Sequence, residues 1–435
     1  ALENSVEMDL NMVHAQMVRR IDDRWIGYGL TDLLTVRQKE ILGGDRKRWR
    51  VPVGRVQVPV LGWVIRKTEL NRSGRTRKFR LRCRAGSGEL NVMFRKPFSE
   101  IDSKEARRIV AALAQGKVNV TSVKTEAVEM NAPPPYTTDT LLAEVSKSFG
   151  WSVGEIMMRL QNLFETGLIT YHRTDHTHVS STGIELARQY LESTWRDEWP
   201  LLFQPKPWGE EGAHECIRPT RPINGEELKR QIDLLQIPGA EALDYRHIRL
   251  YDEIFKRFIA SQMRSSKLLK QHAEFSALDM QSSQDGYVDV LEEGFTKVYP
   301  RRMVVPLAQG DALDVLKVDY VVSSDNPLPS EGDVVAYMKS KGIGRPSTYA
   351  SIIERLKRHG YVFATKRGSL VATKHGIQIY NFLNRKLVQL KSILDEEYTA
   401  SLQRRLQSLE SGSAEFVELA ESCYGDFKLI KALAS

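Results

Sequence analysis

The pattern of apolar and polar positions predicts a helix near the start of the chain and a strand after it. Residues 11–28 carry an apolar stripe at helical spacing, formed by Ala15, Val18, Ile21 and Trp25. Residues 78–84 instead alternate, with Lys78, Arg80, Arg82 and Arg84 between Phe79, Leu81 and Cys83. A period of two predicts a strand with one apolar and one cationic face. Such a face is either solvated or neutralised by an anion, for which a phosphate backbone is the natural candidate.

The middle of the chain predicts two helices and an exposed tyrosine. Three prolines at 133–135 indicate a stiff connector, and residues 136–150 and 153–166 read as helices after it. The inner face of the second helix consists of Ile156, Leu160, Leu163 and Phe164. Gly167 should end this helix. The apolar run at 168–171 then predicts a short strand, and polar residues follow it, so we expect Tyr171 to be exposed.

The last third of the chain has the outline of a winged helix. A glycine-rich loop at 342–348 opens a predicted helix that Ser347 or Thr348 would cap, and residues 361–372 read as a hairpin. A helix that follows such a loop offers backbone N–H groups to phosphate, and Arg345 adds charge there. Residues 380–390 and 397–409 read as further helices.

Length and composition indicate a globular protein of two to four domains. The chain has 435 residues, which is too many for one hydrophobic core, and 41% of them are hydrophobic and 27% charged. The longest apolar runs fall short of the roughly 18 residues of a membrane span. Three widely spaced cysteines indicate neither a zinc site nor a disulfide framework, so we expect a reducing compartment. The acidic first residues, without Met, predict a cut inside a longer protein rather than a signal peptide.

Local spacing alone leaves the candidate chemistry open. A free tyrosine has a pKa near ~10 and is only ~0.1% ionised at neutral pH, but Arg173 could stabilise a phenolate at Tyr171. Most tyrosines simply pack their ring and bond their hydroxyl. His214 has no metal-ligand spacing around it and is a weak signal. Arg19 and Asp23 are four residues apart, either as a surface ion pair or as an arginine held rigid to grip phosphate.

Five motifs together resemble the signatures of type IA DNA topoisomerases. In this chain they read AQMVRRIDDRWIGY at 15–28, GRVQVP at 54–59, GLITYHRTD at 167–175, AHECIRPT at 213–220 and GIGRPSTYAS at 342–351. They occur in the family's order and the resemblance covers essentially the whole chain. The segments WIG at 25–27, LGW at 61–63 and GFTK at 294–297 look most like the topoisomerase half of reverse gyrase.

The resemblance implies a multi-domain, mixed α and β fold that closes into a ring. A mainly helical base domain with winged-helix-like units would comprise residues 1–62 and 325–435. A β-rich arch would comprise residues 63–135 and 265–324. The active-site tyrosine domain, also mainly helical, would comprise residues 136–264. Two crossings would tether it to the arch, so that it could swing as one gate.

The resemblance also implies an enzyme that cleaves one DNA strand and reseals it. Tyr171 would attack a backbone phosphate, Arg173 would stabilise charge on its oxygens and His214 would orient the strand. The implied DNA-binding residues are Arg19, Asp23, Arg55, Gln57, Arg345, Ser347 and Thr348. The full enzyme would introduce positive supercoils in a hyperthermophile's cytoplasm, with ATP consumed. The alternatives are an ordinary relaxing type IA topoisomerase and, for this chain alone, a non-catalytic clamp on single-stranded DNA. A tyrosine recombinase fits less well, because it needs an Arg and His cluster around a C-terminal Tyr.

The chain also departs from the family pattern. His176 and His178 stand where the family has Ser and Arg, and Cys216 stands for Ala. Residues 51–53 read VPV in place of LSA. The family's Toprim domain holds Mg²⁺ on a DxD-type acidic set, and this chain has no DxD. We therefore expect no metal site in this chain, Mg²⁺ on a Toprim domain and ATP on a helicase-like domain. DNA and these two domains would be its partners.

Overall fold

The protein consists of two compact units, each built from several chain segments. The computed structural model describes residues 8–43, 50–86, 88–212 and 214–434. We call the first the helical unit; it comprises Ala1–Glu69, Asp139–Met157 and Leu328–Ser435. We call the second the sheet unit; it comprises Leu70–Thr138 and Met158–Pro327. Helices and strands both occur, which confirms the mixed α and β class. The three-domain division and the ring stay predictions.

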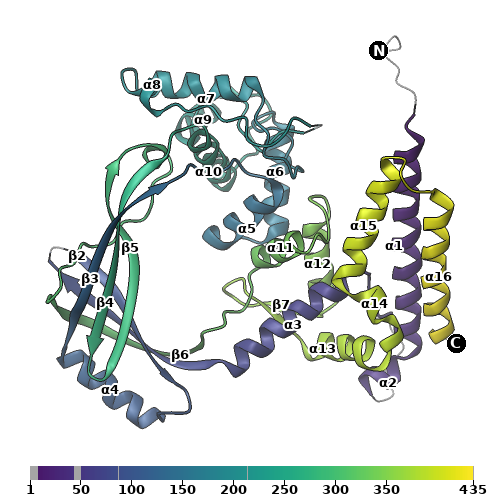
Figure 1. Ribbon diagram of the computed structural model, residues 1–435, viewed down its shortest axis with the longest axis horizontal. Helices are drawn as coiled ribbons and strands as arrows, with labels where there is room; N and C mark the ends of the chain where they lie inside the picture. Colours follow the sequence, from purple (N-terminus) through teal and green to yellow (C-terminus); the bar gives the residue numbers. More distant parts are fainter. Residues whose placement is uncertain (1–7, 44–49, 87, 213, 435) are drawn as a thin grey trace. The chain divides into compact units, whose positions relative to one another are not determined.

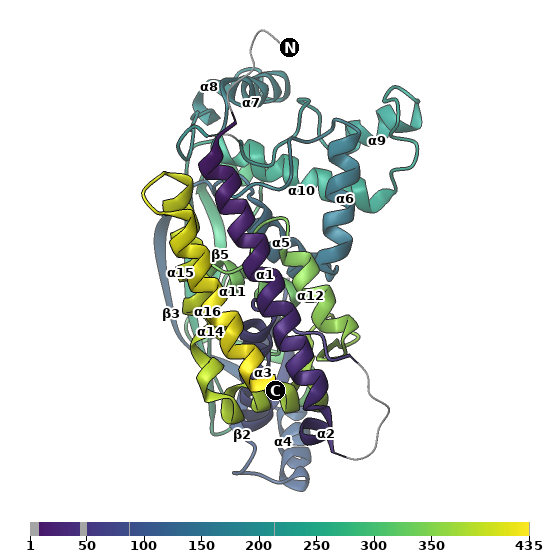
Figure 2. The same ribbon diagram turned by 90° about the vertical axis from the view of Figure 1, so that its right-hand side faces the viewer.

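The centre of the helical unit is a long helix packed against two C-terminal helices. Helix α1 (Leu10–Val36) lies beside α15 (Glu396–Glu410) and α16 (Phe416–Ala434), as Figures 1 and 2 show. The shared core consists of Ala15, Val18, Leu402, Leu406, Leu409, Leu419 and Cys423. The predicted helix is confirmed and continues eight residues beyond Tyr28. Trp25 is only partly buried, because its ring packs at the edge of this core against Tyr424 and Phe427.

A helix and a hairpin confirm the winged-helix outline. Helix α12 (Tyr349–Arg358) ends before Gly360, whose φ is 69°, and β7 (Val362–Ala364) pairs antiparallel with β8 (Leu370–Ala372). The predicted side-chain cap is wrong. Thr348 is the N-cap residue, but its hydroxyl donates to the carbonyl oxygen of Arg345 and accepts from the same residue's N–H. The loop's own turn thus uses the hydroxyl that would otherwise cap the helix.

The remaining elements of the helical unit are short helices around this centre. They are α2 (Gln38–Leu42), α3 (Gln57–Ser73), α5 (Thr138–Phe149), α6 (Val153–Glu165), α11 (Glu331–Ser340), α13 (Lys374–Asn381) and α14 (Lys391–Leu394). Helices α3, α5 and α6 each extend into the sheet unit. One continuous helix over 380–390 is wrong: α13 gives way to a π segment (Phe382–Lys386) and a 3₁₀ turn (Val388–Leu390). Phe382, Leu383 and Leu390 are all buried, so tertiary packing overrides helical propensity here.

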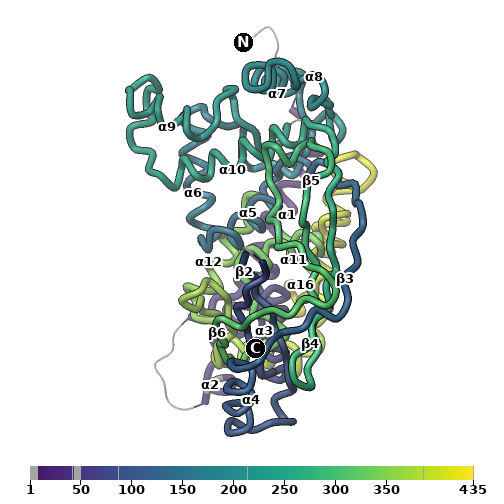
Figure 3. The backbone as a smooth tube through the Cα atoms, turned by 90° about the vertical axis from the view of Figure 1, so that its left-hand side faces the viewer, coloured from purple at the N-terminus to yellow at the C-terminus, as the bar shows by residue number. Residues whose placement is uncertain are grey.

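The sheet unit contains one antiparallel sheet in the order β2-β1-β6-β3-β4-β5, traced in Figure 3. The strands are β1 (Arg75–Ala85), β2 (Gly88–Pro97), β3 (Lys117–Met130), β4 (Ser266–Ala277), β5 (Met280–Glu292) and β6 (Ala312–Ser324). The apolar face of β1, with Phe79, Leu81 and Cys83, is fully buried under α4 (Ser103–Gln115) and neighbouring strands. The cationic positions of β1 face outward, which confirms the predicted alternation.

The sheet unit also contains several helices and a 3₁₀ turn. They are α7 (Ser181–Thr194), α8 (Trp199–Leu202), α9 (Gly225–Asp233), α10 (Tyr245–Ser261) and the 3₁₀ turn Phe295–Lys297. Among the described residues, no helix is both long enough and apolar enough to cross a membrane.

Candidate active site

Tyr171 lies on a loop where two of the five motifs run antiparallel. The N–H of Thr170 donates to the carbonyl oxygen of Arg218 at 2.9 Å, and that of Thr220 donates to Leu168 at 3.1 Å. The strand predicted at 168–171 is wrong, since only one isolated bridge forms there, between Ile169 and Pro219. The hydroxyl of Thr170 donates to the carbonyl oxygen of Cys216 at 2.7 Å and accepts from the N–H of Arg218 at 3.0 Å. These side-chain hydrogen bonds take the place of the backbone hydrogen bonds of a strand pair.

Side chains along this loop alternate between inside and outside. Tyr171 and Arg173 are exposed, whereas His172 and Thr174 are buried. The hydroxyl of Thr138 holds the buried side, donating to the carbonyl oxygen of His172 at 2.6 Å and accepting from the N–H of Thr174 at 2.9 Å. This anchoring presents the phenol and the guanidinium two residues apart on the open side of the loop.

The antiparallel pairing places His214 beside the tyrosine. The two ring centroids are 5.4 Å apart, and Phe164 contacts the tyrosine ring edge-on at 5.3 Å. The side chain of Tyr171 is 38% exposed, so its hydroxyl is presented as expected. Arg173 makes one long hydrogen bond of 3.4 Å to Gln161. The three residues expected to be catalytic therefore lie together around one exposed phenol.

His172 is neutral behind this group. Burial, assisted by the positive charge of Arg173, lowers the pKa of His172 to about 4. Neither ring nitrogen has a hydrogen-bond partner in the described part of the chain. An uncharged ring therefore packs directly behind the exposed tyrosine.

The residue pair Glu215 and Arg218 escaped the sequence reasoning, although both belong to the second motif. The Arg218 guanidinium is buried and forms two 2.8 Å bonds to the Glu215 carboxylate. Glu215 also accepts from the hydroxyl of Ser180, the N-cap residue of α7. The pair thus ties the segment that carries His214 to the start of that helix. The i,i+3 spacing of these two opposite charges is the sequence signal that could have revealed the pair.

Three of the residues that depart from the family pattern, His176, His178 and Cys216, lie in the same loop region. The N–H of His176 donates to the hydroxyl of Thr174, and the ring of His176 lies 3.6 Å from Asp175. The backbone carbonyl oxygen of His178 accepts a hydrogen bond from the N–H of Cys216, and Cys216 is fully buried. Ala213, the first residue of its motif, lies outside the described residues.

A second group of predicted site residues lies in the helical unit, with partners that differ from the predicted ones. Asp23 pairs with Arg55 at 2.8 Å, and Arg19 donates to Gln403 of α15 at 2.9 Å. The pairing of Arg19 with Asp23 is therefore wrong. Arg55 also forms a second ion pair: its Nε lies 3.1 Å from a carboxylate oxygen of the buried Asp22.

Positive charge concentrates in this second group. Burial and the nearby charge of Arg345 both lower the pKa of Arg19. The like charge of the second guanidinium disfavours the charged form of Arg19, while Glu410 and Asp23 oppose this effect. Ser347 and Thr348 are exposed on the same loop as Arg345. Gln57 and Arg55 are both buried rather than facing solvent.

Asp22 and Tyr398 are further members that sequence reasoning missed. Asp22 is fully buried on α1 and accepts from the Tyr398 hydroxyl at 3.2 Å, while that hydroxyl also donates to Asp426 at 2.6 Å. Burial raises the pKa of Asp22, which the charge of Arg55 opposes. Asp22 lies four residues after the buried Val18 and four before the next buried residue of α1. This helical spacing is the sequence signal that could have revealed its burial.

Comparisons with known proteins show the family to which the chain belongs. Residues 7–421 match the family described as DNA topoisomerase, so the chain belongs to that family, and to its type IA class. It is 37% identical to reverse gyrase 1 of Aquifex aeolicus and 36% identical to reverse gyrase of Pyrococcus furiosus, and each match covers 98% of this chain. The chain spans only 35% and 33% of those two proteins. Full-length topoisomerase I of Thermotoga maritima matches with a TM-score of 0.72 at 25% identity, over all of this chain and 71% of that one.

Proposed function

We propose that this chain is the topoisomerase portion of a reverse gyrase and that Tyr171 is its nucleophile. The observation that carries the proposal is the exposed phenol of Tyr171, with His214 beside it and Arg173 on the same side of the loop. The similarity to reverse gyrases over 98% of the chain supports the assignment.

In the proposed reaction the phenolic oxygen attacks a backbone phosphorus of one DNA strand. A phosphorus–oxygen bond to tyrosine forms, and the bond from phosphorus to the 3′-oxygen breaks. The phenol loses its proton and the departing 3′-oxygen gains one, which leaves a 5′-phosphotyrosyl link and a 3′-hydroxyl. Because one phosphoester replaces another, the 3′-hydroxyl can reverse the reaction after strand passage without ATP.

The chain's own residues supply position and charge for this step. Arg173 stabilises negative charge on the phosphoryl oxygens as it develops, and His214 orients the strand. Arg19 and Arg345 hold the DNA backbone on the helical unit, assisted by Asp23, Arg55 and Gln57 and by the hydroxyls of Ser347 and Thr348. The neutral ring of His172 adds no competing cation behind the phenol.

The described residues do not fit a Mg²⁺ site of this chain's own. No group of three or more His, Cys, Asp or Glu side chains converges within residues 8–43, 50–86, 88–212 and 214–434. We propose that a Toprim domain binds Mg²⁺ and that a helicase-like domain binds ATP. In that assembly the enzyme would add positive supercoils in the cytoplasm of a hyperthermophile.

The decisive experiment detects the covalent adduct and its polarity. The complete enzyme is mixed with an oligonucleotide labelled at either end and then denatured. A 5′-phosphotyrosyl link leaves the 3′ label on the protein and releases the 5′ label. Tyr171→Phe should abolish the adduct, while Tyr245→Phe, at a tyrosine that is 68% exposed, should retain it. An adduct that persists in Tyr171→Phe, or carries the 5′ label, would remove the assignment.

The same assay separates the alternative of a non-catalytic clamp. Because we propose that Mg²⁺ binds to a Toprim domain, this chain alone would bind DNA without cleaving it. Salt-sensitive binding of single-stranded DNA without adduct would then be expected from this chain, with adduct formation restored in the complete enzyme. Relaxation without positive supercoiling by the complete enzyme would indicate an ordinary type IA topoisomerase.

A further inference from the structure

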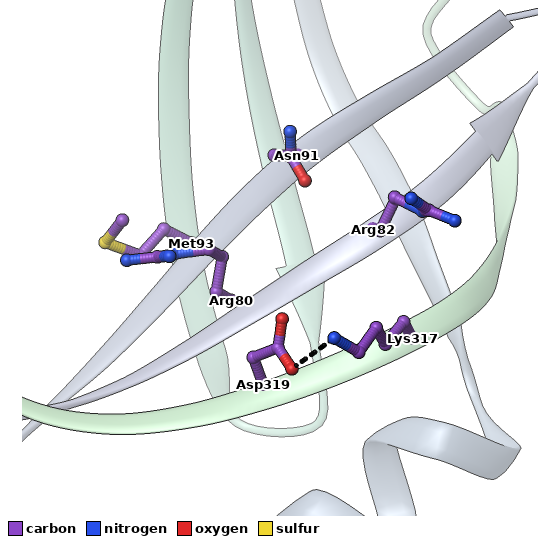
Figure 4. Close-up of a pocket in the computed structure, with 6 residues that line it drawn as sticks. All are labelled: Arg80, Arg82, Asn91, Met93, Lys317 and Asp319. Carbon is purple, nitrogen blue, oxygen red and sulfur yellow. Dashed lines mark ion pairs between the residues drawn. The ribbon is translucent and has the colours of Figure 1, made fainter.

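The outer face of the sheet unit carries a cationic surface that the strand-cleavage site does not use. Three adjacent strands, β2, β1 and β6, border a depression of about 530 Å³. Its lining consists of Arg80 and Arg82 of β1, Asn91 and Met93 of β2, and Lys317 and Asp319 of β6, shown in Figure 4. The opposite face of β1 is the buried apolar core, so these side chains cannot turn inward.

The strand register places like charges directly opposite each other on this face. Arg82 of β1 is the cross-strand partner of Lys317 on β6. Lys78 is likewise the partner of Arg95 on β2, but Asp325 lies 3.0 Å from Lys78 and 3.7 Å from Arg95 and compensates that pair. Directly opposed like charges destabilise a sheet by a few tenths of a kcal/mol up to ~1 kcal/mol. A sheet selected only for stability gains nothing from the Arg82–Lys317 pair, whereas a bound polyanion would neutralise it.

The acidic neighbours leave much of this charge available. Lys317 pairs with Asp319 at 2.8 Å and Arg82 pairs with Glu89 at 3.3 Å, but all four side chains are about half exposed. Exposed pairs of this kind contribute little and exchange readily for another anion. Arg80, between them, has no acidic partner within the part of the chain that the structure describes. In Figure 4 it extends along Met93, away from Asp319.

We propose that this face is a second DNA-binding surface that contacts the phosphate backbone. From Lys78 to Arg84 the outward side chains of β1 repeat every two residues, so the cationic row is about 20 Å long. A row of that length matches several successive phosphates rather than one small anion. Binding is independent of base sequence, since guanidinium and ammonium groups on a flat strand face reach phosphates and no groove-reading element accompanies them. The inference deepens the proposed function, because it assumes that DNA is the substrate.

The test compares the salt dependence of DNA binding between charge variants. Arg80→Gln/Arg82→Gln is made in the complete protein, and Lys104→Gln/Arg107→Gln, at exposed positions of α4, is the control with the same change in net charge. Fluorescence anisotropy gives the Kd for single-stranded and for duplex DNA over a range of salt concentrations. Losing two phosphate contacts should reduce the slope of log K against log salt by about 1.4 for a single strand or about 1.8 for a duplex.

Each outcome bears on the proposal. A reduced slope in the Arg80/Arg82 variant alone supports the surface, and the arm that changes identifies single-stranded or duplex DNA. Equal slopes in wild type and variant, or an equal reduction in the control, would overturn it. Circular dichroism checks that both variants fold. Adduct formation on a short oligonucleotide should be the same in both variants as in wild type. If the wild-type enzyme forms no adduct at all, the proposed function is refuted independently of this surface.

Discussion

Replacement of His172 by Phe should remove a large pH dependence from the tyrosine loop. The imidazole is fully buried beside Phe164 and Tyr171, at ring-centroid distances of 6.0 and 5.7 Å. Its nitrogens have no partners among the described residues. A phenylalanine ring fits an apolar site of this kind without leaving buried polar atoms unpaired.

The pKa of His172 determines the size of the effect. Burial lowers the pKa from 6.5 in the unfolded chain to about 4 in the folded protein. Each pKa unit corresponds to about 1.4 kcal/mol, so a charged His172 costs the folded loop about 3 kcal/mol. Because the folded pKa is depressed, this stability is fully present above pH 6.5 and is lost as the pH falls through 6.5 towards 4.

Hydrogen exchange at the amide of Thr174 measures the local effect, since that N–H donates to the Thr138 hydroxyl. After correction for intrinsic exchange rates, the opening free energy should fall by up to about 3 kcal/mol between pH 7 and pH 4 in wild type. The decrease in His172→Phe should be much smaller. Equal pH dependence in both proteins, or a His172 ring that titrates near 6.5 by ¹³C NMR, would refute the reasoning.

Further substitutions test the helical unit. Asp22→Ala leaves the buried Arg55 with one of its two carboxylate partners and should lower the free energy of urea unfolding by about 3–5 kcal/mol. Asp32→Ala, which breaks an exposed ion pair, should lower it by less than about 1 kcal/mol. Equal losses would show that burial is irrelevant. Gly332→Ala would put a methyl group 2.6 Å from a backbone oxygen of α5 and should lower the thermal midpoint by the equivalent of about 1–3 kcal/mol. Gly425→Ala, with open space around it on α16, should raise the midpoint slightly, and an opposite order of the two would contradict the packing.

The sequence predicted the elements whose pattern is local. The alternation in β1 and the apolar stripe on α6 each require only a few neighbouring residues to be recognised, and both have the expected faces. The motif around Tyr171 also predicted its exposure, but not that the polar residues His172 and Thr174 of the same run are buried.

The contacts that position the site were not predictable in the same way. Asp23 is bound by Arg55, 32 residues away, and Arg19 is bound by Gln403, 384 residues away. The spacing on α1 suggested that Asp23 and Arg19 bind each other, since helical neighbours are the only partners that a local pattern can show. The π segment and the 3₁₀ turn that follow α13 were not predicted for the same reason. The burial of their apolar side chains depends on tertiary packing, which a local pattern does not show.

By itself the sequence predicted the faces of the most periodic elements, indicated that the chain belongs with the type IA topoisomerases, and gave the motifs in which we propose the chemistry. Only the tertiary structure decided that residues 216–220 run antiparallel to the segment before Tyr171, and that the ring of His214 lies 5.4 Å from the phenol ring. It also decided that Arg82 meets Lys317 across a strand pair. Periodicity reports the environment of a residue, whereas its partner depends on how segments far apart in the chain fold back on one another.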